Sequence, residues 1–334
     1  MTGDGAVICG VGSWLPPVLV TNADLAARLD TSDEWIRTRT GIRQRYVVPP
    51  GMATGDLAVE AGRAALKSAG VDAVDAVIVA TTTPDRPCPA TAPSVAARLG
   101  LGGVAAFDVG AVCTGFLYAL AAGAGLIASS FAERVLVLGS DTFSTILDPA
   151  DRSTMAVFGD GAGGVVLRRG GAGVPGALGP FVLGSDGAQV DLITVRAGGS
   201  SQRSTGHPPG PGEAFFTMAG REVFAAAVQR MASASRQALD TAGWTVGDLD
   251  VLVAHQANLR ILRAVADDLE LDPDRMIVDL DRTANTAAAS IPLALDQANA
   301  SGRLRAGDRV LLTAFGGGAT WGATTLVWPD VDAA

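Results

Sequence analysis

The chain has 334 residues, of which 48% are hydrophobic and 18% are charged. This balance predicts a compact globular protein and excludes a disordered or fibrous chain, and the length is enough for two domains or one large duplicated domain. The formal net charge of −9 argues against nucleic acid as a bulk electrostatic partner.

Nothing in the sequence points to a membrane, a metal or a disulfide. The first residues carry no basic region followed by an apolar stretch, so no signal peptide is predicted, and the apolar run 116–127 is too short to span a bilayer. Cys9, Cys88 and Cys113 stand at wide, unpatterned spacing, which fits neither a disulfide framework nor a zinc site. We therefore expect a cytoplasmic protein without a bound metal.

The first half of the chain alternates helix-like and strand-like segments. An amphipathic helix is predicted over 55–68, and a continuous apolar strand follows over 76–80. Another strand-like run near Phe107 leads through small residues into a long stretch rich in Ala, Gly and Leu. Continuous apolar strands between helices predict sheets that are covered by helices on both faces.

Cys113 stands between that strand-like run and the start of the predicted buried helix. At a helix N-terminus, unpaired backbone N–H groups and the positive end of the dipole stabilise a thiolate and raise the reactive fraction of the thiol. A free cysteine is more often a small buried hydrophobic residue. The local pattern alone leaves both roles open.

The chain resembles itself at a nearly constant spacing. Segment 65–80 matches 238–254 at an offset of 173 to 174 residues, and strand 134–138 matches 309–313 at an offset of 175. A second amphipathic helix, predicted over 221–241, leads into the second copy. Several matches in order predict the duplication of one α/β unit.

A stretch rich in glycine and proline, 170–180, is the predicted boundary between the copies. It divides the chain into an N-terminal half, 1–172, which carries Cys113, and a C-terminal half, 173–334. A second irregular region, 198–213, is predicted to be a long surface loop that is either functional or merely mobile.

Only two histidines are available as a catalytic base. His207 lies in a loop rich in proline and glycine and is expected to be exposed. His255 directly follows the apolar strand 251–254, and the end of a strand is where open α/β sheets place their ligands. The alternative is a core histidine bonded to backbone. With Cys113 in the first half, each half would contribute one reactive group.

Two further segments of the second half have patterns that fit a site. Asn285 opens an Ala-rich, helix-like segment, where asparagine most often serves as a helix cap. The glycine run 316–318 follows strand 310–313 and would let backbone N–H groups approach a ligand, as an oxyanion hole requires. The run is not a nucleotide-binding loop, because it lacks the G-x-G-x-x-G spacing and the chain has no P-loop.

Six ordered motifs resemble the ketoacyl synthase III family of the thiolase superfamily over essentially the whole chain. They are 33–43 (DEWIRTRTGIR), 107–120 around Cys113, 158–163 (FGDGAG), 255–261 (HQANLRI), 285–292 (NTAAASIP) and 315–322 (FGGGATWG). The resemblance implies a duplicated α/β fold in five layers, α-β-α-β-α, and a homodimer. The implied fold agrees with the internal repeat.

The resemblance implies a Cys-His-Asn triad of Cys113, His255 and Asn285. Elongating ketosynthases use a second histidine and thiolases a second cysteine, and this chain offers no credible candidate for either. The implied reaction is a decarboxylating Claisen condensation, in which an acyl-CoA acylates Cys113 and malonyl-acyl carrier protein supplies the attacking carbanion. The backbone N–H groups of Cys113 and Gly317 would form the oxyanion hole, and no metal or other cofactor would be needed.

The same resemblance assigns residues to coenzyme A. Trp35 and Arg152 would flank its adenine, Arg39 would lie near its phosphates, and Asn258 would bond its pantetheine arm. A helix-face anchor is the alternative role for Trp35, and a solvated loop charge is the alternative for Arg152.

The acyl group would occupy a pocket that includes Cys88, Phe158 and Phe224. In relatives, an aromatic residue in the segment around Cys88 closes the acyl tunnel from the partner subunit. Because cysteine is small, a starter larger than acetyl is predicted, unless neighbouring side chains fill the space.

The acidic carrier protein would dock against arginines near the histidine motif. Asp267 and Asp268 stand where basic residues are common in the family, so docking is predicted either to select a particular carrier or to use other arginines. The candidates are Arg221, Arg230, Arg260 and Arg263.

These departures favour a priming ketosynthase of a type II polyketide pathway over the acetyl-CoA-specific enzyme that starts fatty acid synthesis. Two further roles stay open. One is an acyltransferase that passes the acyl group to an alcohol or amine; the presence of Asn285 argues against this role. The second is an inactive ketosynthase-like partner subunit; the presence of Cys113 argues against it, because the nucleophile is replaced in such subunits.

Overall fold

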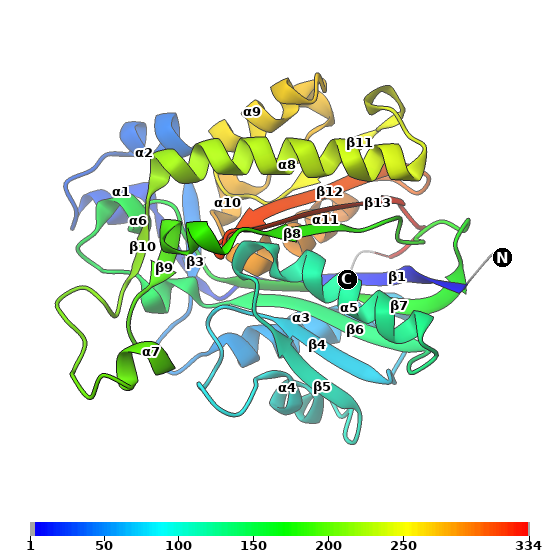
Figure 1. Ribbon diagram of the computed structural model, residues 1–334, viewed down its shortest axis with the longest axis horizontal. Helices are drawn as coiled ribbons and strands as arrows, with labels where there is room; N and C mark the ends of the chain where they lie inside the picture. Colours follow the sequence, from blue (N-terminus) through cyan, green and yellow to red (C-terminus); the bar gives the residue numbers. More distant parts are fainter. Residues whose placement is uncertain (1–3, 333–334) are drawn as a thin grey trace.

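The computed structural model describes residues 4–332 as two larger sheets with helices between and outside them (Figure 1). The first sheet has the strand order β1-β7-β6-β4-β5. In it β4 runs parallel to β5 and β6, whereas β7 is antiparallel to both β6 and β1. The strands are β1 (Asp4–Trp14), β4 (Ala76–Ala80), β5 (Ala105–Val109), β6 (Arg134–Asp141) and β7 (Gly161–Gly171).

The second sheet repeats this pattern with the order β11-β12-β13-β8. Again a parallel pair, β11 and β12, is followed by two antiparallel neighbours. An isolated parallel bridge between Leu252 and Met276 stands where β5 stands in the first sheet. The strands are β8 (Val182–Ser185), β11 (Val251–Ala254), β12 (Arg309–Gly316) and β13 (Thr320–Val327).

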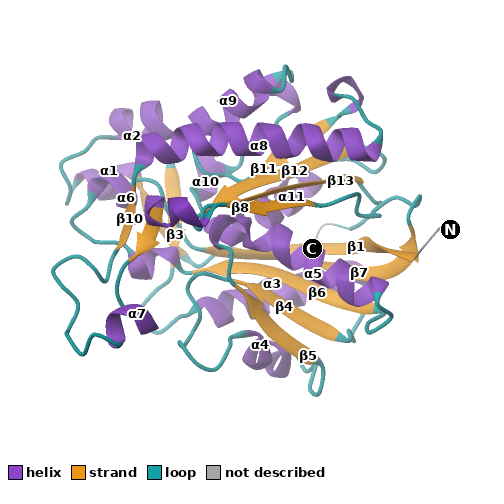
Figure 2. Ribbon diagram, in the orientation of Figure 1, coloured by secondary structure: helices purple, strands orange, loops and turns teal. Residues whose placement is uncertain are grey.

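The helices complete five layers, as the predicted fold requires (Figure 2). Helices α5 (Gly115–Ala128) and α11 (Ser290–Ala300) lie between the sheets, and α3 (Thr54–Ala69) with α4 (Ala92–Arg98) covers the outer face of the first. Helices α8 (Gly220–Ala242) and α9 (Leu259–Asp268) form the outer layer on the second sheet. The predicted helices 55–68 and 221–241 are confirmed to within one residue at each end.

The central layer joins the two halves into one core. Buried side chains of α5 and α11, among them Phe116, Leu120, Ile291 and Leu295, share a single apolar cluster with residues of both sheets. Burial of such side chains is the main stabilising contribution available to a fold of this kind. The two sheets therefore have no separate cores on their facing sides.

Shorter elements gather at the ends of the strands that will form the site. The segment 18–47 packs its buried Leu25, Ile36 and Ile42 against residues of α8 and α9 from the other half. The short helices and strands are α1 (Asn22–Ala26), α2 (Asp33–Thr40), α6 (Arg152–Met155), α7 (Ser200–Arg203), α10 (Leu280–Thr283), β2 (Val18–Thr21), β3 (Gln44–Val47), β9 (Ile193–Val195) and β10 (Phe216–Met218), with 3-10 turns at η1 (Val112–Thr114), η2 (Phe143–Ile146), η3 (Gly187–Leu192), η4 (Val246–Asp248), η5 (Pro273–Arg275) and η6 (Ala287–Ala289).

Two sequence-based expectations concern the connections. The region 198–213 is a largely exposed surface loop, as predicted, and carries α7 and the exposed His207. The stretch 170–180 lies where the chain passes from the first sheet to the second, and its Ala177 and Leu178 bridge to a strand of each. No helix of the described residues is long and apolar enough to cross a membrane.

Candidate active site

Cys113 lies in η1, between the end of β5 and the start of α5, and is buried. The preceding Val112 has a positive φ of 48°, which turns the chain sharply into the helix. The end of β12 packs directly on this turn, because a Cβ at Gly316 would stand 2.8 Å from the backbone nitrogen of Cys113. Only glycine permits that approach without a shift of the backbone.

His255 follows β11, and its imidazole is fixed by a contact at Nδ1. Its backbone N–H donates to Thr313 O at 2.8 Å, and its Nδ1 lies 2.6 Å from Ser290 Oγ. Burial lowers the pKa of His255 to about 3, so the ring is neutral at ordinary pH. Since Nδ1 is bonded to the serine, Nε2 is the nitrogen left to meet a substrate.

Asn285 is fixed by three hydrogen bonds. Its backbone N–H donates to Val157 O at 3.0 Å, and its carbonyl accepts from the N–H of Gly159 at 3.0 Å. The side-chain Oδ1 accepts from the N–H of Ala287 at 2.9 Å, a local turn bond two residues along the chain; the N-cap position of η6 is Thr286, so Asn285 is not the helix cap that the sequence suggested. With Oδ1 engaged in this way, the Nδ2 hydrogens remain available as donors.

The turns that carry these residues are related by the duplication. Val112 and Ala287 both have a φ of 48°, and the helices that follow begin 175 residues apart, at Gly115 and Ser290. The turn at Cys113 in one half therefore corresponds to the turn beside Asn285 in the other. The fold brings the two turns together at one end of the central layer.

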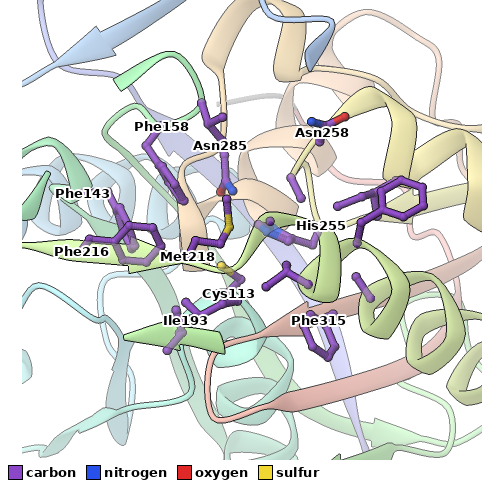
Figure 3. A pocket seen from close by; sticks show the side chains of 18 of the residues that line it. Cys113, Phe143, Phe158, Ile193, Phe216, Met218, His255, Asn258, Asn285 and Phe315 are labelled. Atoms are coloured by element: carbon purple, nitrogen blue, oxygen red, sulfur yellow. The ribbon is translucent and has the colours of Figure 1, made fainter. Parts of the chain in front are cut away.

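A cavity joins the three residues (Figure 3). Figure 3 shows the side chains of Cys113, His255 and Asn285 pointing into the same space. The rings of Phe143, Phe158 and Phe216 form one wall, with Phe143 and Phe158 stacked at 4.4 Å between ring centroids and Phe216 edge-on to both. The other lining residues are mostly apolar: Val112, Val157, Ile193, Met218, Gly220, Val223, Phe224, Ala227, Met231, Ala257, Asn258, Ile261 and Phe315.

The electrostatics of the free site do not favour a thiolate. Burial raises the pKa of Cys113, and the buried carboxylate of Asp141 raises it further. The positive end of α5 acts in the opposite direction, but burial disfavours the charged thiolate. We therefore expect a neutral thiol beside a neutral imidazole before substrate binds, which differs from the expectation based on the helix N-terminus alone.

Two family models match the chain. One, described as 3-Oxoacyl-[acyl-carrier-protein (ACP)] synthase III, matches residues 107–187, and its C-terminal companion matches residues 239–328. Beta-ketoacyl-[acyl-carrier-protein] synthase III 3 of Streptomyces coelicolor is 62% identical over 329 residues, which cover 98% of each chain. The synthase III of Pseudomonas aeruginosa is 52% identical over 98% of this chain and 97% of its own. This chain belongs to the beta-ketoacyl-acyl carrier protein synthase III family.

Solved structures of the family superpose closely on this synthase III. The Pseudomonas aeruginosa enzyme matches with a TM-score of 0.93 at 51% identity, over 98% of this chain and 99% of the other. A priming beta-ketosynthase from a polyketide biosynthetic pathway matches with a TM-score of 0.90 at 36% identity, over 98% and 97%. The chain is thus an acyltransferase with the thiolase fold, a ketosynthase that initiates fatty acid or polyketide synthesis.

The residues expected at coenzyme A lie close together in this synthase III. The guanidinium carbons of Arg39 and Arg152 stand 5.0 and 5.2 Å from the ring centroid of Trp35. Arg152 also bonds to the backbone and the carboxylate of Asp30. Asn258 lines the cavity, caps α9 by accepting from the N–H of Arg260 at 2.8 Å, and donates to the carbonyl of Arg39 at 3.3 Å.

Two of the three residues expected in the acyl pocket line the cavity, and the third does not. Phe158 is buried in the aromatic wall, and Phe224 lines the cavity with 39% of its surface exposed. Cys88 is exposed and is not among the residues that line the cavity of the single chain. Its expected role requires a partner subunit and stays a proposal.

The arginines expected at the carrier surface lie on the outer helices. Arg221 is exposed at the start of α8, and Arg260 and Arg263 are both exposed on α9. Arg230 is engaged within the chain, because it stacks on Trp321 at 4.2 Å and lies 3.7 Å from Asp186. Both acids on α9 are exposed, and Asp268 pairs with Arg236 at 2.6 Å.

Three buried polar residues of the site were not predicted from the sequence. Ser290 lies within the motif 285–292, where its type carries no signal of its own. Asp141 accepts hydrogen bonds from Thr83 and its neighbours and from the N–H of Ala288, and burial raises its pKa to about 6. Its place at the end of β6, like that of His255 after β11, was a usable signal.

The third is Arg45 of β3, which is buried. Its guanidinium donates to Asn22 Oδ1 at 2.7 Å and to Ala156 O at 2.8 Å, and burial lowers its pKa to about 10. It therefore ties α1 to the end of α6, which carries Arg152. No sequence signal separates it from the neighbouring arginines. Among the described residues, no group of three or more His, Cys, Asp or Glu side chains is placed to hold a metal.

Proposed function

We propose that this synthase III transfers an acyl group larger than acetyl from coenzyme A to Cys113 and condenses it with malonyl-acyl carrier protein. The observation that carries the proposal is the convergence of Cys113, His255 and Asn285 in one apolar cavity, where the amide N–H groups of Asn285 have no hydrogen-bond partner among residues 4–332. The family supplies the reaction class, and the site supplies the groups.

In the first step, the sulfur of Cys113 attacks the carbonyl carbon of the acyl thioester. The bond to the sulfur of coenzyme A breaks, and the thiol proton of Cys113 ends on the departing thiol. The N–H groups of Cys113 and Gly317 are proposed to hold the oxyanion that forms in between. The close packing of β12 on the Cys113 turn is the support for pairing these two segments.

In the second step, the malonyl thioester carbonyl accepts hydrogen bonds from His255 Nε2 and Asn285 Nδ2. Carbon dioxide leaves, and the electron pair of the broken bond becomes the enolate that these donors stabilise. The enolate carbon attacks the acyl carbonyl, and Cys113 leaves and regains a proton. Removing one such donor costs about 10²–10³ in rate. No step requires a metal or another cofactor.

The walls of the cavity bear on the size of the starter. Val112, Ile193 and Phe216 line both this cavity and a second hollow, which is mostly apolar and is also lined by Thr82 and Val190. These three side chains therefore separate the two spaces. A longer acyl chain would pass them into the second hollow, and this space together with the small Cys88 supports a starter larger than acetyl and a role in priming a polyketide pathway.

The remaining contacts follow from the same proposal. Trp35, Arg39, Arg152 and Asn258 would bind coenzyme A, and the exposed arginines of α8 and α9 would bind the carrier protein. We also propose a homodimer. Its support is β5, which has β4 as its only strand partner among the described residues and so presents an unpaired edge.

The test is the intact mass of the protein after incubation with a panel of acyl-CoAs, from acetyl to branched and six-carbon chains, with Cys113→Ala in parallel. We expect a one-acyl adduct on the wild type, fastest with a chain longer than acetyl, and none on the variant.

Each contrary outcome corrects a different part of the proposal. Acylation by acetyl alone would indicate ordinary fatty acid initiation and would contradict the argument from Cys88. An equal adduct on Cys113→Ala would place the nucleophile elsewhere. No adduct from any donor would contradict the acyl-enzyme mechanism.

A further inference from the structure

Ser290 is the partner of His255 on the side away from the substrate. It is the first residue of α11, and both side chains are 2% exposed. The distance of 2.6 Å between Nδ1 and Oγ is that of a strong hydrogen bond. Either atom could be the donor, and the choice decides what Nε2 can do.

A second hydrogen bond to the serine settles the choice. Ser290 Oγ also accepts from the backbone N–H of Gln256 at 3.3 Å. That N–H can only donate, and its peptide is held firmly because the Gln256 side chain bonds to Ala254 O at 2.8 Å and accepts from the N–H of Asp279 at 2.8 Å.

A serine hydroxyl has one hydrogen and two lone pairs. If His255 Nδ1 carried a hydrogen, Oγ would accept twice and its own hydrogen would need a third partner, and no such partner is found among the described residues. A buried hydroxyl without an acceptor is costly. If the hydroxyl donates to Nδ1 instead, both serine bonds and the imidazole are satisfied.

We propose that Ser290 is a positioning residue that holds His255 as the tautomer with hydrogen on Nε2. In that form Nε2 faces the cavity as a hydrogen-bond donor, which is what the malonyl carbonyl requires. Because Nε2 already carries a hydrogen in this tautomer, it cannot accept the proton of Cys113. His255 is therefore used in the condensation step and not as the base that activates the thiol. This part rests on the proposed function, whereas the tautomer itself does not.

The first experiment reads the tautomer directly by NMR of protein labelled with ¹⁵N-histidine. The chain has only two histidines, so His207→Gln assigns the signals of His255. In the wild type we expect Nε2 to carry the hydrogen and Nδ1 to give the signal of an unprotonated nitrogen. In Ser290→Ala we expect that preference to weaken, and Ser290→Thr, which keeps the hydroxyl, should restore it.

A matched control is available in Ser235→Ala. Ser235 is also fully buried, but its hydroxyl has no hydrogen-bond partner in the described part of the chain. It should leave the His255 signals unchanged. A wild type with hydrogen on Nδ1, or a Ser290→Ala spectrum identical to the wild type, would overturn the proposal.

The second experiment separates the two steps of the reaction. Removing the outer hydrogen-bond partner of a metal-ligating histidine typically costs about 10- to 100-fold, and we expect a comparable effect here: Ser290→Ala should slow condensation with malonyl-acyl carrier protein by about tenfold or more. Formation of acyl-Cys113, followed by mass, should change by no more than about threefold, since tautomer choice is not used there.

The thermal midpoint and the acylation rate report whether Ser290→Ala folds. Equal losses in both steps would mean a merely structural role and would overturn the proposal. A wild type that forms no acyl-Cys113 would defeat the proposed function, but the NMR measurement would still decide the tautomer.

Discussion

At the scale of single residues, the site combines groups whose charged forms are disfavoured. Burial raises the pKa of both Cys113 and Asp141 and lowers that of His255. A neutral thiol and a neutral imidazole suit a reaction in which the histidine donates a hydrogen bond rather than a proton. They also make the stability of the protein depend on pH.

We predict that His255 makes the fold sensitive to acid. Its pKa is about 3 in the folded chain against an ordinary 6.5, so below pH 6.5 the unfolded chain binds a proton that the folded chain does not. Stability is therefore lost as the pH falls through this window. Between pH 6.5 and about 4, the wild type should lose about 3 kcal/mol more than His255→Gln, measured by urea unfolding at each pH.

The comparison with His255→Gln isolates this group. Asp141, with a pKa raised to about 6, acts in the opposite direction, since its folded form keeps a proton that the unfolded form releases between pH 3.8 and 6. It is present in both proteins and cancels in the difference. His207→Gln, which removes the exposed loop histidine, serves as the control, and a wild-type curve parallel to that of His255→Gln would contradict the prediction.

At the scale of elements, the position of Cys113, the proposed nucleophile, is set by three segments at once. The turn η1 starts α5, β12 packs against its backbone, and η6 lies beside it from the other half. The position of the Cys113 amide therefore depends on a strand from the far end of the chain. A small change in β12 should for this reason shift the backbone and the thiol of Cys113.

We predict that Gly316→Ala impairs acylation. The new Cβ would stand 2.8 Å from the nitrogen of Cys113 and 3.0 Å from that of Thr114, and backbone cannot move aside as a flexible side chain can. We expect a loss of about 1–3 kcal/mol in stability from overpacking, together with a slower rate of acyl-Cys113 formation in the mass assay.

Gly125→Ala is the matched control on α5. A Cβ there meets no atom within 4 Å, and alanine is the better helix former, so stability should hold or rise by up to about 1 kcal/mol. If Gly316→Ala acylated as fast as Gly125→Ala, the packing of β12 on the turn would not be what positions Cys113.

At the scale of the whole molecule, the central layer joins the two halves, and the edge of the first sheet is the proposed contact with a second subunit. Helices α5 and α11 share one core with both sheets, so the halves 1–172 and 173–334, which we keep as the proposed units of the repeat, do not pack as separate bodies. The free edge of β5 is the place where a second copy could continue the first sheet.

We predict that Cys88→Phe narrows the range of starters. In the proposed homodimer, Cys88 reaches the acyl pocket of the partner, and an aromatic ring would fill the space that a long acyl chain needs. Acylation by a six-carbon acyl-CoA should fall by about tenfold or more relative to acetyl-CoA, since a blocked pocket forfeits the burial of several methylenes.

Cys88→Ser, which stays small, is the control and should keep the wild-type preference. Sedimentation should show a dimer for the wild type and for both variants. A monomeric wild type, or a starter preference that Cys88→Phe leaves unchanged, would contradict the prediction.

Much of this architecture could be predicted from the sequence because it depends on local pattern. The apolar runs 76–80 and 251–254 and the helices 55–68 and 221–241 are set by hydrophobic periodicity, and their constant offset revealed the duplication. Cys113, His255 and Asn285 could be identified as candidate site residues from their places at strand ends and helix starts. The family resemblance then gave their expected roles.

Only the tertiary structure decided how these residues are held. The bond from Ser290 to His255 spans 35 residues, and the contact of Asp141 with Ala288 spans 147. Such contacts join groups through the fold, and no spacing along the chain encodes them. The pKa of Cys113 depends in the same way on burial and on an acid from another strand, so the chemistry of the site is determined by packing that appears only when both halves meet.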